Sequence, residues 1–376
     1  MKKFVALAMA AAMAMSMVAC SNTSTTTPNN NTNTNTNTET KAPEKTDGED
    51  KADVEIDASS FAELAPVELK GADSAGVGSA GQLLGEAIAK NVEEITGGKM
   101  TVTYFPNSEM GGDNDIQQGM IDGLLDYIVL QTAPSVSFVP EAAVFDLPMV
   151  FAKYDGDKID EALNSEDSEF HKTISEKYAD HNYKLLGYLQ NATYRLTTSN
   201  VKLDTLAAFK DLKIRTMENK NHMAFWTALG ANPTPLAWPE VYISLQNGTI
   251  AAQENAADTC ASANFQEVQK YLNFTNHILY LNQVVMNNEK FDSLDPAYQQ
   301  ALLEAVQKSI DEVRPELEKL DKDSKDKLAA GGMEMVEYDD SFYDEVLNLD
   351  GVKELYADID TAVDGLGTIL QNELAK

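Results

Sequence analysis

Arg215 is the residue whose type and surroundings point to the most specific chemistry in this chain. It belongs to Lys213–Thr216, a segment that we predict to be a strand, and the polar run Gln253-Glu254-Asn255 follows further along. A guanidinium binds a carboxylate through two parallel, charge-assisted hydrogen bonds, because its planar fork matches the two oxygens. Taken alone, an arginine on a strand is more often an exposed or salt-bridged residue. The residue type makes Arg215 a candidate carboxylate clamp without deciding between these alternatives.

The other reactive residue types show no catalytic or metal-binding pattern. The four histidines have no paired metal-ligand spacing and no cysteine partner. Cys260 has no activating base visible in the sequence, and no Gly-x-Ser-x-Gly elbow is present. The acidic cluster Asp321–Asp326 lacks the glycine and the terminal glutamate of a calcium loop. We therefore predict a protein that is not an enzyme and that holds no metal or other cofactor.

A glycine-rich segment, Gly76–Gly81, satisfies the Gly-x-Gly-x-x-Gly fingerprint of dinucleotide binding, between a predicted strand and a predicted helix. The fingerprint also requires an acidic residue at the end of the next strand, and that strand ends in Tyr104–Asn107 without one. An NAD-dependent oxidoreductase is therefore a disfavoured alternative. A glycine-rich loop before a helix also brings the backbone close to other ligands, so Ser74 is a candidate residue of a binding cleft.

The elements that must position these residues alternate between strands and helices. The predicted strands are Val67–Lys70, Met100–Phe105, Tyr127–Leu130, Tyr183–Leu189, Lys213–Thr216 and Ile278–Met286, and the predicted helices are Gly81–Ile95, Ile116–Leu125, Asp167–Tyr178, His222–Leu229 and Pro239–Gln246. This order predicts a parallel α/β sheet covered on both faces. The 311 residues from Pro66 to Lys376 are long for one core and suit two lobes.

A long helical pattern runs from Asp295 to Gly331, with Asp295 as a plausible cap and Pro296 at the first helical position. Pro315 falls inside this pattern and removes a backbone donor, which predicts a kink. Two interpretations remain open. Either one bent helix has a hinge at Pro315, or two helices simply meet at the proline.

Several blocks of the sequence occur together, in this order, in one known family. They are Val139–Pro148, Leu196–Asn200, Lys213–Met217, Gly230–Pro235, Gln253–Asn255 and Glu267–Leu272. The chain resembles the solute-binding proteins of TRAP (tripartite ATP-independent periplasmic) transporters over about Pro66 to Asp340, most densely from Val139 to Met286. The resemblance implies an α/β, two-lobed, periplasmic-binding-protein-like fold with a long helix that spans the hinge.

The resemblance also implies roles for individual residues. Arg215 matches the family arginine that holds the carboxylate of an organic acid, and Arg195 matches a second arginine that contacts the ligand. Asn255 matches the asparagine of the Gln-Glu-Asn-Pro motif, although Ala256 replaces the proline and Ala251–Ala252 replaces Asp-Gly. The alternatives are that Arg195 braces the lobe junction and that Asn255 forms a turn.

Four further residues are candidates for substrate binding. Trp238 matches an aromatic residue that packs over the ligand, with an ordinary core position as the alternative. Tyr242 lies four residues further on the same helix face and suits a core position better than a contact. Gln131 follows the buried strand Tyr127–Leu130, where some members place a polar pocket residue. His277 matches a position near the cleft, with plain packing as the alternative.

The N-terminus reads as a secretory signal. Two lysines precede the apolar run Phe4–Val18, and small residues lead to Cys20. The run is shorter than the roughly 20 residues of a membrane-spanning helix. Cys20 lies in a sequence similar to a lipobox, so we expect a signal peptide over residues 1–19 and a lipid on Cys20. A plain cleaved signal is the alternative.

Residues 20–65 would then form a lipidated cysteine and a disordered tether, because nothing apolar is available to bury before Val54. The lipid would anchor the protein to the bilayer at the outer face of the cell membrane, in the periplasm if the cell has an outer membrane. The formal net charge of −31, or −33 without Lys2 and Lys3, repels nucleic acid. A bound anion must therefore be attracted by a local basic site.

These observations predict an extracytoplasmic binding protein that closes two lobes over an organic acid and delivers it to a TRAP permease. We assign residues 66–191 with 281–320 to one lobe, 192–280 with 321–345 to the other, and 346–376 to a C-terminal helical segment. The family binds sugar acids, C4-dicarboxylates and 2-oxo acids, and the polar Gln131 and Asn255 favour a hydroxylated acid. A sensor that presents its closed form to a receptor is the alternative from another functional class.

Overall fold

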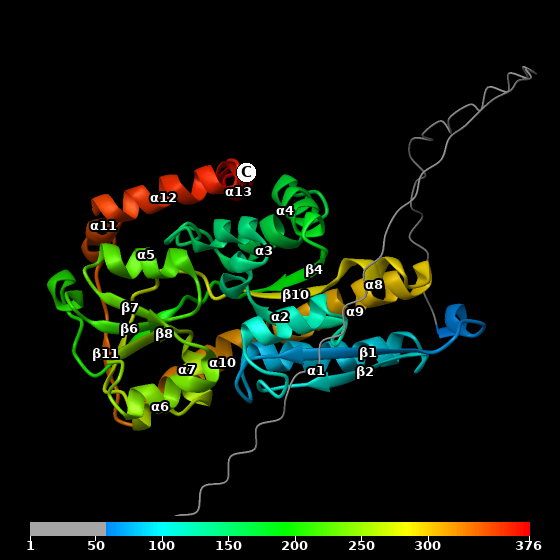
Figure 1. Cartoon of the computed structure of the whole chain (residues 1–376), viewed down its shortest axis with the longest axis horizontal. Coiled ribbons are helices and arrows are strands. Elements are labelled where there is room, and N and C mark those ends of the chain that lie inside the picture. Colours follow the sequence, from blue (N-terminus) through cyan, green and yellow to red (C-terminus); the bar gives the residue numbers. More distant parts are fainter. Residues whose placement is uncertain (1–57) are drawn as a thin grey trace, which may run out of the picture. The chain divides into compact units, whose positions relative to one another are not determined.

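The computed structural model describes residues 58–376, which contain two β-sheets with helices packed around them (Figure 1). Each sheet is the centre of a lobe, and we call these the first and the second lobe. The predicted signal over residues 1–19, Cys20 and the tether as far as residue 57 lie outside the described residues. Between residues 58 and 376, no helix combines the length and the apolar character needed to cross a membrane.

The first sheet has five strands. In spatial order they are β2 (Met100–Phe105), β1 (Val67–Asp73), β3 (Tyr127–Gln131), β10 (Asn282–Asn287) and β4 (Tyr183–Leu189). β1 runs parallel to β2 and β3, whereas β10 runs antiparallel to both of its neighbours. The helices that pack on this sheet are α1 (Ala80–Ile95), α2 (Asp113–Ile121), α3 (Gly156–Asn164), α4 (Glu169–Asp180), α8 (Asn288–Asp292) and α9 (Pro296–Val313).

The second sheet has six short strands. In spatial order they are β11 (Glu334–Val336), β9 (Tyr271–Asn273), β5 (Leu196–Ser199), β8 (Ala252–Asn255), β6 (Lys213–Thr216) and β7 (Asn232–Pro235). β6 runs parallel to β7 and β8, and β5 runs antiparallel to β8 and β9. The second lobe also contains α5 (Lys220–Ala228), α6 (Val241–Gln246), α7 (Ala257–Ser262) and α10 (Glu316–Ala330).

The predicted parallel sheet is wrong in one respect, because both sheets are mixed. β10 is antiparallel inside the first sheet, and all of its residues are buried. A fully buried run looks the same in a parallel and in an antiparallel strand, since the side-chain pattern reports burial and not direction. The direction of β10 follows from the return of the chain from the second lobe.

Two of the segments that carry the chain between the lobes pair with each other. Residues 190–195 lead from β4 to β5, and residues 274–281 lead back from β9 to β10. Tyr194 and Leu279 form an antiparallel bridge between these segments. Because the two crossings are hydrogen-bonded together, a rotation of one lobe against the other must bend them jointly.

The long helical pattern is divided at Pro315 into α9 and α10. Arg314 and Pro315 have helical dihedral angles but form a turn between the two helices. Asp295 caps α9 by accepting a hydrogen bond from the backbone nitrogen of Ala297 (3.0 Å), and Pro296 is its first residue. The structure therefore divides the pattern into two helices at the proline, and a hinge at Pro315 stays a prediction.

The folded part begins earlier than the tether prediction allowed. Ala58–Phe61 forms a short 3-10 helix, and Phe61 is fully buried with its ring stacked on Tyr298 at 5.3 Å. The ammonium group of Lys99 donates hydrogen bonds to the carbonyl oxygens of Ala62 (3.0 Å) and Leu64 (3.2 Å). Residues 58–65 are thus ordered, and the predicted disorder as far as residue 65 is wrong there because an isolated Phe61 gives no periodic signal.

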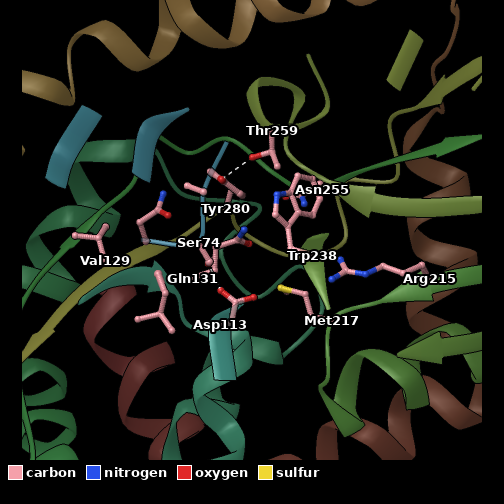
Figure 2. Close-up of a pocket in the computed structure, with 13 residues that line it drawn as sticks. Ser74, Asp113, Val129, Gln131, Arg215, Met217, Trp238, Asn255, Thr259 and Tyr280 are labelled. Carbon is pink, nitrogen blue, oxygen red and sulfur yellow. Dashed lines mark hydrogen bonds between the residues drawn. The ribbon is translucent and has the colours of Figure 1, made fainter. Parts of the chain in front are cut away.

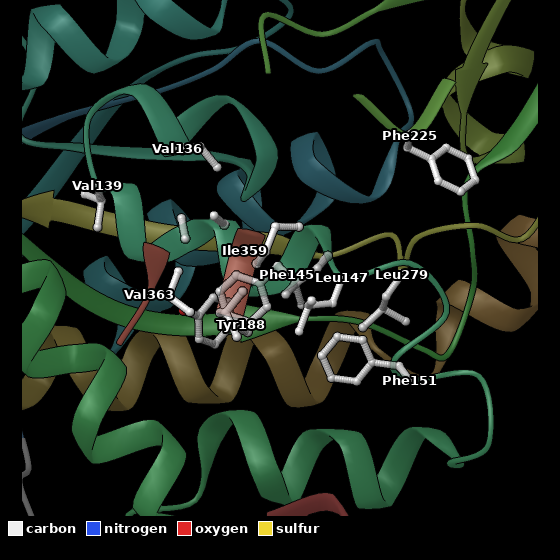
Figure 3. Close-up of a cluster of buried hydrophobic side chains, with 14 of the residues drawn as sticks. Val136, Val139, Phe145, Leu147, Phe151, Tyr188, Phe225, Leu279, Ile359 and Val363 are labelled. Atoms are coloured by element: carbon white, nitrogen blue, oxygen red, sulfur yellow. The ribbon is translucent and has the colours of Figure 1, made fainter. Parts of the chain in front are cut away.

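The three C-terminal helices contribute to a core shared by both lobes. They are α11 (Asp340–Asn348), α12 (Asp350–Ala362) and α13 (Leu366–Leu374). α12 packs on α5 of the second lobe, and α13 packs on α3 and α4 of the first lobe (Figure 1). One buried cluster joins Phe145 of the first lobe, Phe225 of the second and Ile359 of α12 (Figure 3). The C-terminal helices therefore stabilise the arrangement of both lobes.

Truncation of Ile359 tests this role. Ile359 is 2% exposed, so Ile359→Ala should lower the free energy of unfolding by about 2–5 kcal/mol through lost burial and a residual cavity. Lys353→Ala, at an exposed position of the same helix, should change it by no more than about 0.5 kcal/mol. Urea unfolding of both variants measures the difference. Equal effects would show that α12 is not part of the shared core.

Candidate functional site

A cavity lies between the two lobes and is partly open to solvent. It is lined by Ser74, Ala75, Asp113, Val129, Leu130, Gln131, Arg215, Met217, Trp238, Asn255, Thr259, Tyr280 and Asn282 (Figure 2). Five of the eight predicted substrate-binding residues meet here: Ser74, Gln131, Arg215, Trp238 and Asn255. The first two come from the first lobe and the other three from the second.

Strand direction explains why these residues meet. β6 and β8 are parallel neighbours with Arg215 opposite Gln253, so the carboxyl ends of both strands lie at one edge of the second sheet. β1 and β3 are likewise parallel, which places Ser74 and Gln131 at one edge of the first sheet. Ligands of open α/β sheets bind outside the carboxyl ends of the strands. The cavity lies where these two edges face each other.

The lobes touch each other around the cavity, so the structure shows a closed arrangement. The backbone nitrogen of Ala80, at the start of α1, donates to a carboxylate oxygen of Asp258 on α7 (3.0 Å). Asn114 of α2 donates from its amide to Glu218 of the second lobe (2.6 Å). A bound molecule in this arrangement would be enclosed by side chains of both lobes.

Arg215 has a buried guanidinium that is only partly satisfied. The residue is 1% exposed. Its Nε and Nη2 donate to the carbonyl oxygen of Leu236 (2.9 and 2.6 Å), whereas its buried Nη1 has no partner among the described residues. The Trp238 ring centroid lies 5.9 Å from the guanidinium carbon. Burial lowers the pKa of Arg215 to about 10, so it stays charged at neutral pH.

The guanidinium is directed into the site. Figure 2 shows the side chain of Arg215 pointing toward Trp238, Met217 and Asp113. Gly230 has a φ of +84°, a conformation that favours glycine, and it turns the chain from the end of α5 into β7 on this side of the cavity. β7 pairs with β6 and leads to Leu236, whose carbonyl oxygen holds the guanidinium.

Asp113 is an acidic residue of the cavity lining that was not predicted from the sequence. It is the first residue of α2, and the Ser74 hydroxyl donates a hydrogen bond to its carboxylate. Burial raises the pKa of Asp113, while this hydrogen bond and the charges of Arg215 and Arg195 oppose the rise. An acidic residue in the first turn of a helix is common because it complements the helix dipole, so its position carried no signal of a ligand site.

Thr259 and Tyr280 were also missed. Their hydroxyl oxygens lie 2.7 Å apart, and Figure 2 marks this contact by a dashed line. Tyr280 and Asn282 belong to the segment Ile278–Met286, which was predicted as one strand, although β10 begins only at Asn282. The polar side chains of Tyr280 and Asn282 within this largely apolar segment were the sequence feature that could have indicated a binding site.

Arg195 lies behind the cavity wall and not in its lining. It is 1% exposed, and its Nε and Nη2 donate to the side chain and the carbonyl oxygen of Glu254, the latter at 2.8 Å. Its Nη1 donates to Oε1 of Gln131, which does line the cavity. Arg195 therefore orients a lining residue, and direct ligand contact by Arg195 stays a prediction.

His277 and Tyr242 also lie outside the lining. Nε2 of His277 lies 3.1 Å from the carboxylate of Glu254, and burial lowers the pKa of this histidine, which keeps it neutral. Tyr242 is not among the lining residues, and its hydroxyl donates a hydrogen bond to Glu267 (2.8 Å). Ligand contact by His277 therefore stays a prediction, and Tyr242 packs against a buried cluster of the second lobe, as its alternative proposed.

The structure gives no catalytic or cofactor-binding role to Cys260 or to the glycine-rich loop. Cys260 is buried next to the amide of Gln253 (3.3 Å), and burial raises the pKa of its thiol to about 12, which makes it a poor nucleophile. A Cβ atom on Gly76 would lie 2.5 Å from Oγ of Ser262, so the glycine-rich loop packs against α7. Within residues 58–376, no group of three or more metal-ligating side chains is placed to hold a metal ion.

Comparison with known proteins assigns the chain to a family. Residues 78–347 match DctP, described as bacterial extracellular solute-binding protein, family 7. A solute-binding protein of Verminephrobacter eiseniae is 30% identical over 252 residues, 67% of this chain and 74% of the relative. The 2,3-diketo-L-gulonate-binding periplasmic protein YiaO of Escherichia coli is 31% identical over 226 residues, 58% of this chain and 65% of the relative.

Solved structures agree with this assignment. A TRAP periplasmic solute-binding protein of a Sulfitobacter species with bound β-D-galacturonate has a TM-score of 0.75 and 26% identity, covering 81% of this chain and 99% of that one. A counterpart from a Polaromonas species, bound to D-erythronate, has a TM-score of 0.73 and 25% identity, covering 81% and 98%. The predicted two-lobed, periplasmic-binding-protein-like fold is thereby confirmed.

The family rules out the enzyme among the functional classes that the sequence left open, and the sensor stays an alternative. Its members are substrate-binding proteins of transporters that work outside the cytoplasm, and not enzymes. The prediction that the chain is not an enzyme is confirmed, and the NAD-dependent alternative is set aside. The chain belongs to family 7 of the bacterial extracellular solute-binding proteins, the solute-binding proteins of TRAP transporters.

Proposed function

We propose that this protein captures a hydroxylated monocarboxylic acid, of the sugar-acid class, in the cavity between its lobes and delivers it to a TRAP permease. The observation that carries the proposal is the unpaired Nη1 of the buried Arg215. A buried donor without a partner costs about 1–3 kcal/mol, and more when the group is charged. A ligand carboxylate in the cavity would remove this cost and neutralise the guanidinium.

The geometry favours one orientation of the acid. Leu236 holds Nε and one side of Nη2, so the guanidinium is fixed before the ligand arrives and loses little freedom on binding. A carboxylate would accept hydrogen bonds from Nη1 and from the remaining N–H of Nη2. Asn255 uses its side-chain oxygen to accept from Ala256 (3.1 Å), which leaves its amide nitrogen available to the ligand. Trp238 would supply an apolar wall.

The rest of the lining suits hydroxyl groups. Ser74, Gln131, Thr259, Tyr280 and Asn282 present neutral polar groups, and Asp113 presents an acidic one. A second carboxylate on the ligand would be repelled by Asp113, which favours a monoacid over a dicarboxylate. The relative YiaO is named for binding 2,3-diketo-L-gulonate, and two similar structures hold galacturonate and erythronate. These names support a hydroxylated acid.

The remaining parts of the mechanism belong to the same proposal. Two of the lobe boundaries given above, 191/192 and 280/281, fall within the segments that cross between the sheets, whereas 320/321 falls inside α10 and 345/346 inside α11. The C-terminal helical segment packs on both lobes. Opening would bend the two paired crossings, with Pro315 as the hinge between α9 and α10. Closure would enclose the acid, and the closed form would be the one delivered to the permease. A lipid on Cys20 would keep the protein at the membrane.

Replacement of Arg215 tests the clamp. Arg215→Met keeps the length of the side chain and removes the charge, so the affinity for D-galacturonate, D-glucuronate, galactonate or D-erythronate should fall at least about 30-fold, since truncating one partner of a buried charge pair costs about 2–5 kcal/mol. Isothermal titration calorimetry against these acids measures the loss.

Two controls separate a binding role from a structural one. Lys202→Met removes a surface ammonium group that pairs with Glu334 (2.5 Å), away from the cavity lining, and should leave the affinity unchanged. In the absence of ligand, Arg215→Met should unfold near the wild-type temperature, because removing a buried charge without a partner is often neutral or stabilising. A large loss of stability with retained affinity would contradict the proposed clamp.

Asp113→Asn tests the preference for a monoacid. The change removes the charge that faces the ligand, so the ratio of the affinities for D-galacturonate and for its dicarboxylate counterpart galactarate should fall by about tenfold, equivalent to about 1.4 kcal/mol. Asp122→Asn, at the exposed C-terminal end of the same helix, should not change that ratio. Competition titrations give both values, and an unchanged ratio in Asp113→Asn would rule out selection by this carboxylate.

A further inference from the structure

Glu254 is the centre of a buried cluster of charged and titratable groups. It is 0% exposed, accepts the hydrogen bonds from Arg195 described above, and lies 3.1 Å from Nε2 of His277. Its Oε1 atom lies 3.3 Å from Nδ1 of His222 on α5. Arg195 and the two histidines therefore surround a single carboxylate of β8.

His222 extends this cluster into the first lobe. Its Nε2 atom lies 3.2 Å from Oδ1 of Asp146, at the end of the 3-10 helix Pro140–Asp146, which is within ion-pair distance although the two atoms lack hydrogen-bond geometry. The side chains of Asn219 (2.8 Å) and Asn221 (2.9 Å), which precede His222, donate to the other oxygen of Asp146. Asp146 and His222 are each 1% exposed. A buried ion pair thus joins the two lobes, in addition to the two crossing segments.

The two acidic groups beside the His222 ring, Glu254 and Asp146, favour a proton on His222. Both of its ring nitrogens face carboxylates, and a neutral imidazole donates from one nitrogen only. With Asp146 and Glu254 ionised, Arg195 and protonated His222 make the cluster neutral, since His277 is uncharged. Loss of the His222 proton would leave a net negative charge in a site without water access and a lone pair facing a carboxylate oxygen.

The pair is also connected to the ligand cavity. Glu254 holds Arg195, Arg195 holds the side-chain oxygen of Gln131, and Gln131 lines the cavity. Asn255, which follows Glu254 on β8, lines it as well. We propose that Asp146 and His222 are positioning residues for ligand capture, because their interlobe ion pair fixes Glu254 and the groups it holds when the lobes are closed. The inference rests on the proposed function for its link to an acid.

The direction of the pH dependence follows from the surroundings of His222. Burial alone would lower its pKa, but the carboxylates of Glu254 and Asp146 outweigh burial and raise it to about 9. The other groups around Glu254 are Arg195 and neutral His277, and α12, which also packs on α5, buries the apolar Val352, Leu355 and Ile359. Glu254 belongs to the same lobe as His222 and stays beside it when the lobes open, whereas Asp146 does not, so the contribution of Asp146 to the raised pKa favours closure. That stabilisation is lost as the pH rises through about 9.

Nuclear magnetic resonance of the histidine ring protons in the full chain tests the pair without a ligand. The chain has four histidines, so the signal of His222 is identified by its loss in His222→Gln. It should titrate near pH 9 in the wild type and at least about one pH unit lower in Asp146→Asn, which lacks the partner charge. Titration at or below pH 6.5, or no shift in Asp146→Asn, would overturn the proposal.

A measurement of the distance between the lobes then distinguishes an effect of the Asp146–His222 pair on closure from an effect on the stability of the fold alone. Leu124 in the first lobe and Ile243 in the second are 62% and 50% exposed. Spin labels at Leu124→Cys and Ile243→Cys, in a chain with Cys20→Ser, give the distance between the lobes by electron–electron double resonance. Buried Cys260 should not react. The closed fraction should fall between pH 7 and pH 10 in the wild type and in the control His171→Gln, but not in His222→Gln. Equal pH responses of wild type and His222→Gln would contradict the positioning role.

An affinity measurement links the pair to binding. With D-galacturonate as the probe, the affinity of the wild type should fall at least about tenfold between pH 7 and pH 10, and that of His222→Gln should change less than threefold, with His171→Gln matching the wild type. Failure of every tested acid to bind the wild type would contradict the proposed function alone, since the titration and the distances still decide the ion pair. Binding with the same pH profile in wild type and His222→Gln would overturn the positioning role alone.

Discussion

The guanidinium of Arg215 is buried, and both of its hydrogen bonds go to one carbonyl oxygen, that of Leu236. Arg195 is already paired with Glu254, and His222 lies between Glu254 and Asp146. The chain as a whole carries a formal charge of −31 and repels anions at long range. The attraction for an organic acid must therefore come from the short-range contact with Arg215, which selects for a carboxylate that reaches the closed cavity.

This arrangement depends on two groups of interactions outside the cavity. The parallel neighbours β6 and β8 bring Arg215 and Asn255 to one edge of the second sheet, opposite the edge of the first sheet that carries Ser74 and Gln131. The lobes are then joined by paired crossing segments, by a shared apolar core with the C-terminal helices, and by the ion pair of Asp146 and His222. The apolar contacts are insensitive to pH, so the ion pair is the contact through which protonation can act on closure.

The sequence predicted the parts of the fold that have a strong local signal. Met100–Phe105, Tyr183–Leu189 and Lys213–Thr216 are strands with the predicted bounds. β5, β8, β9 and β11 have three or four residues, too few for a periodic pattern, and β7 contains two prolines. The direction of β10 was also invisible, because it is set by the path of the chain through the other lobe.

Five of the predicted site residues line the cavity because motif and topology agree for them. The missed residues have sequence contexts that also fit an ordinary structural role. Asp113 fits an acidic residue at the start of a helix, and Glu254 and His222 are polar residues that only the fold brings together.

The most direct test of the account is a crystal structure of the complex with the acid that binds most tightly in calorimetry. The account predicts a ligand carboxylate within hydrogen-bond distance of Nη1 of Arg215, about 3 Å. A bound acid whose carboxylate lies elsewhere, with Nη1 still unpaired, would contradict it.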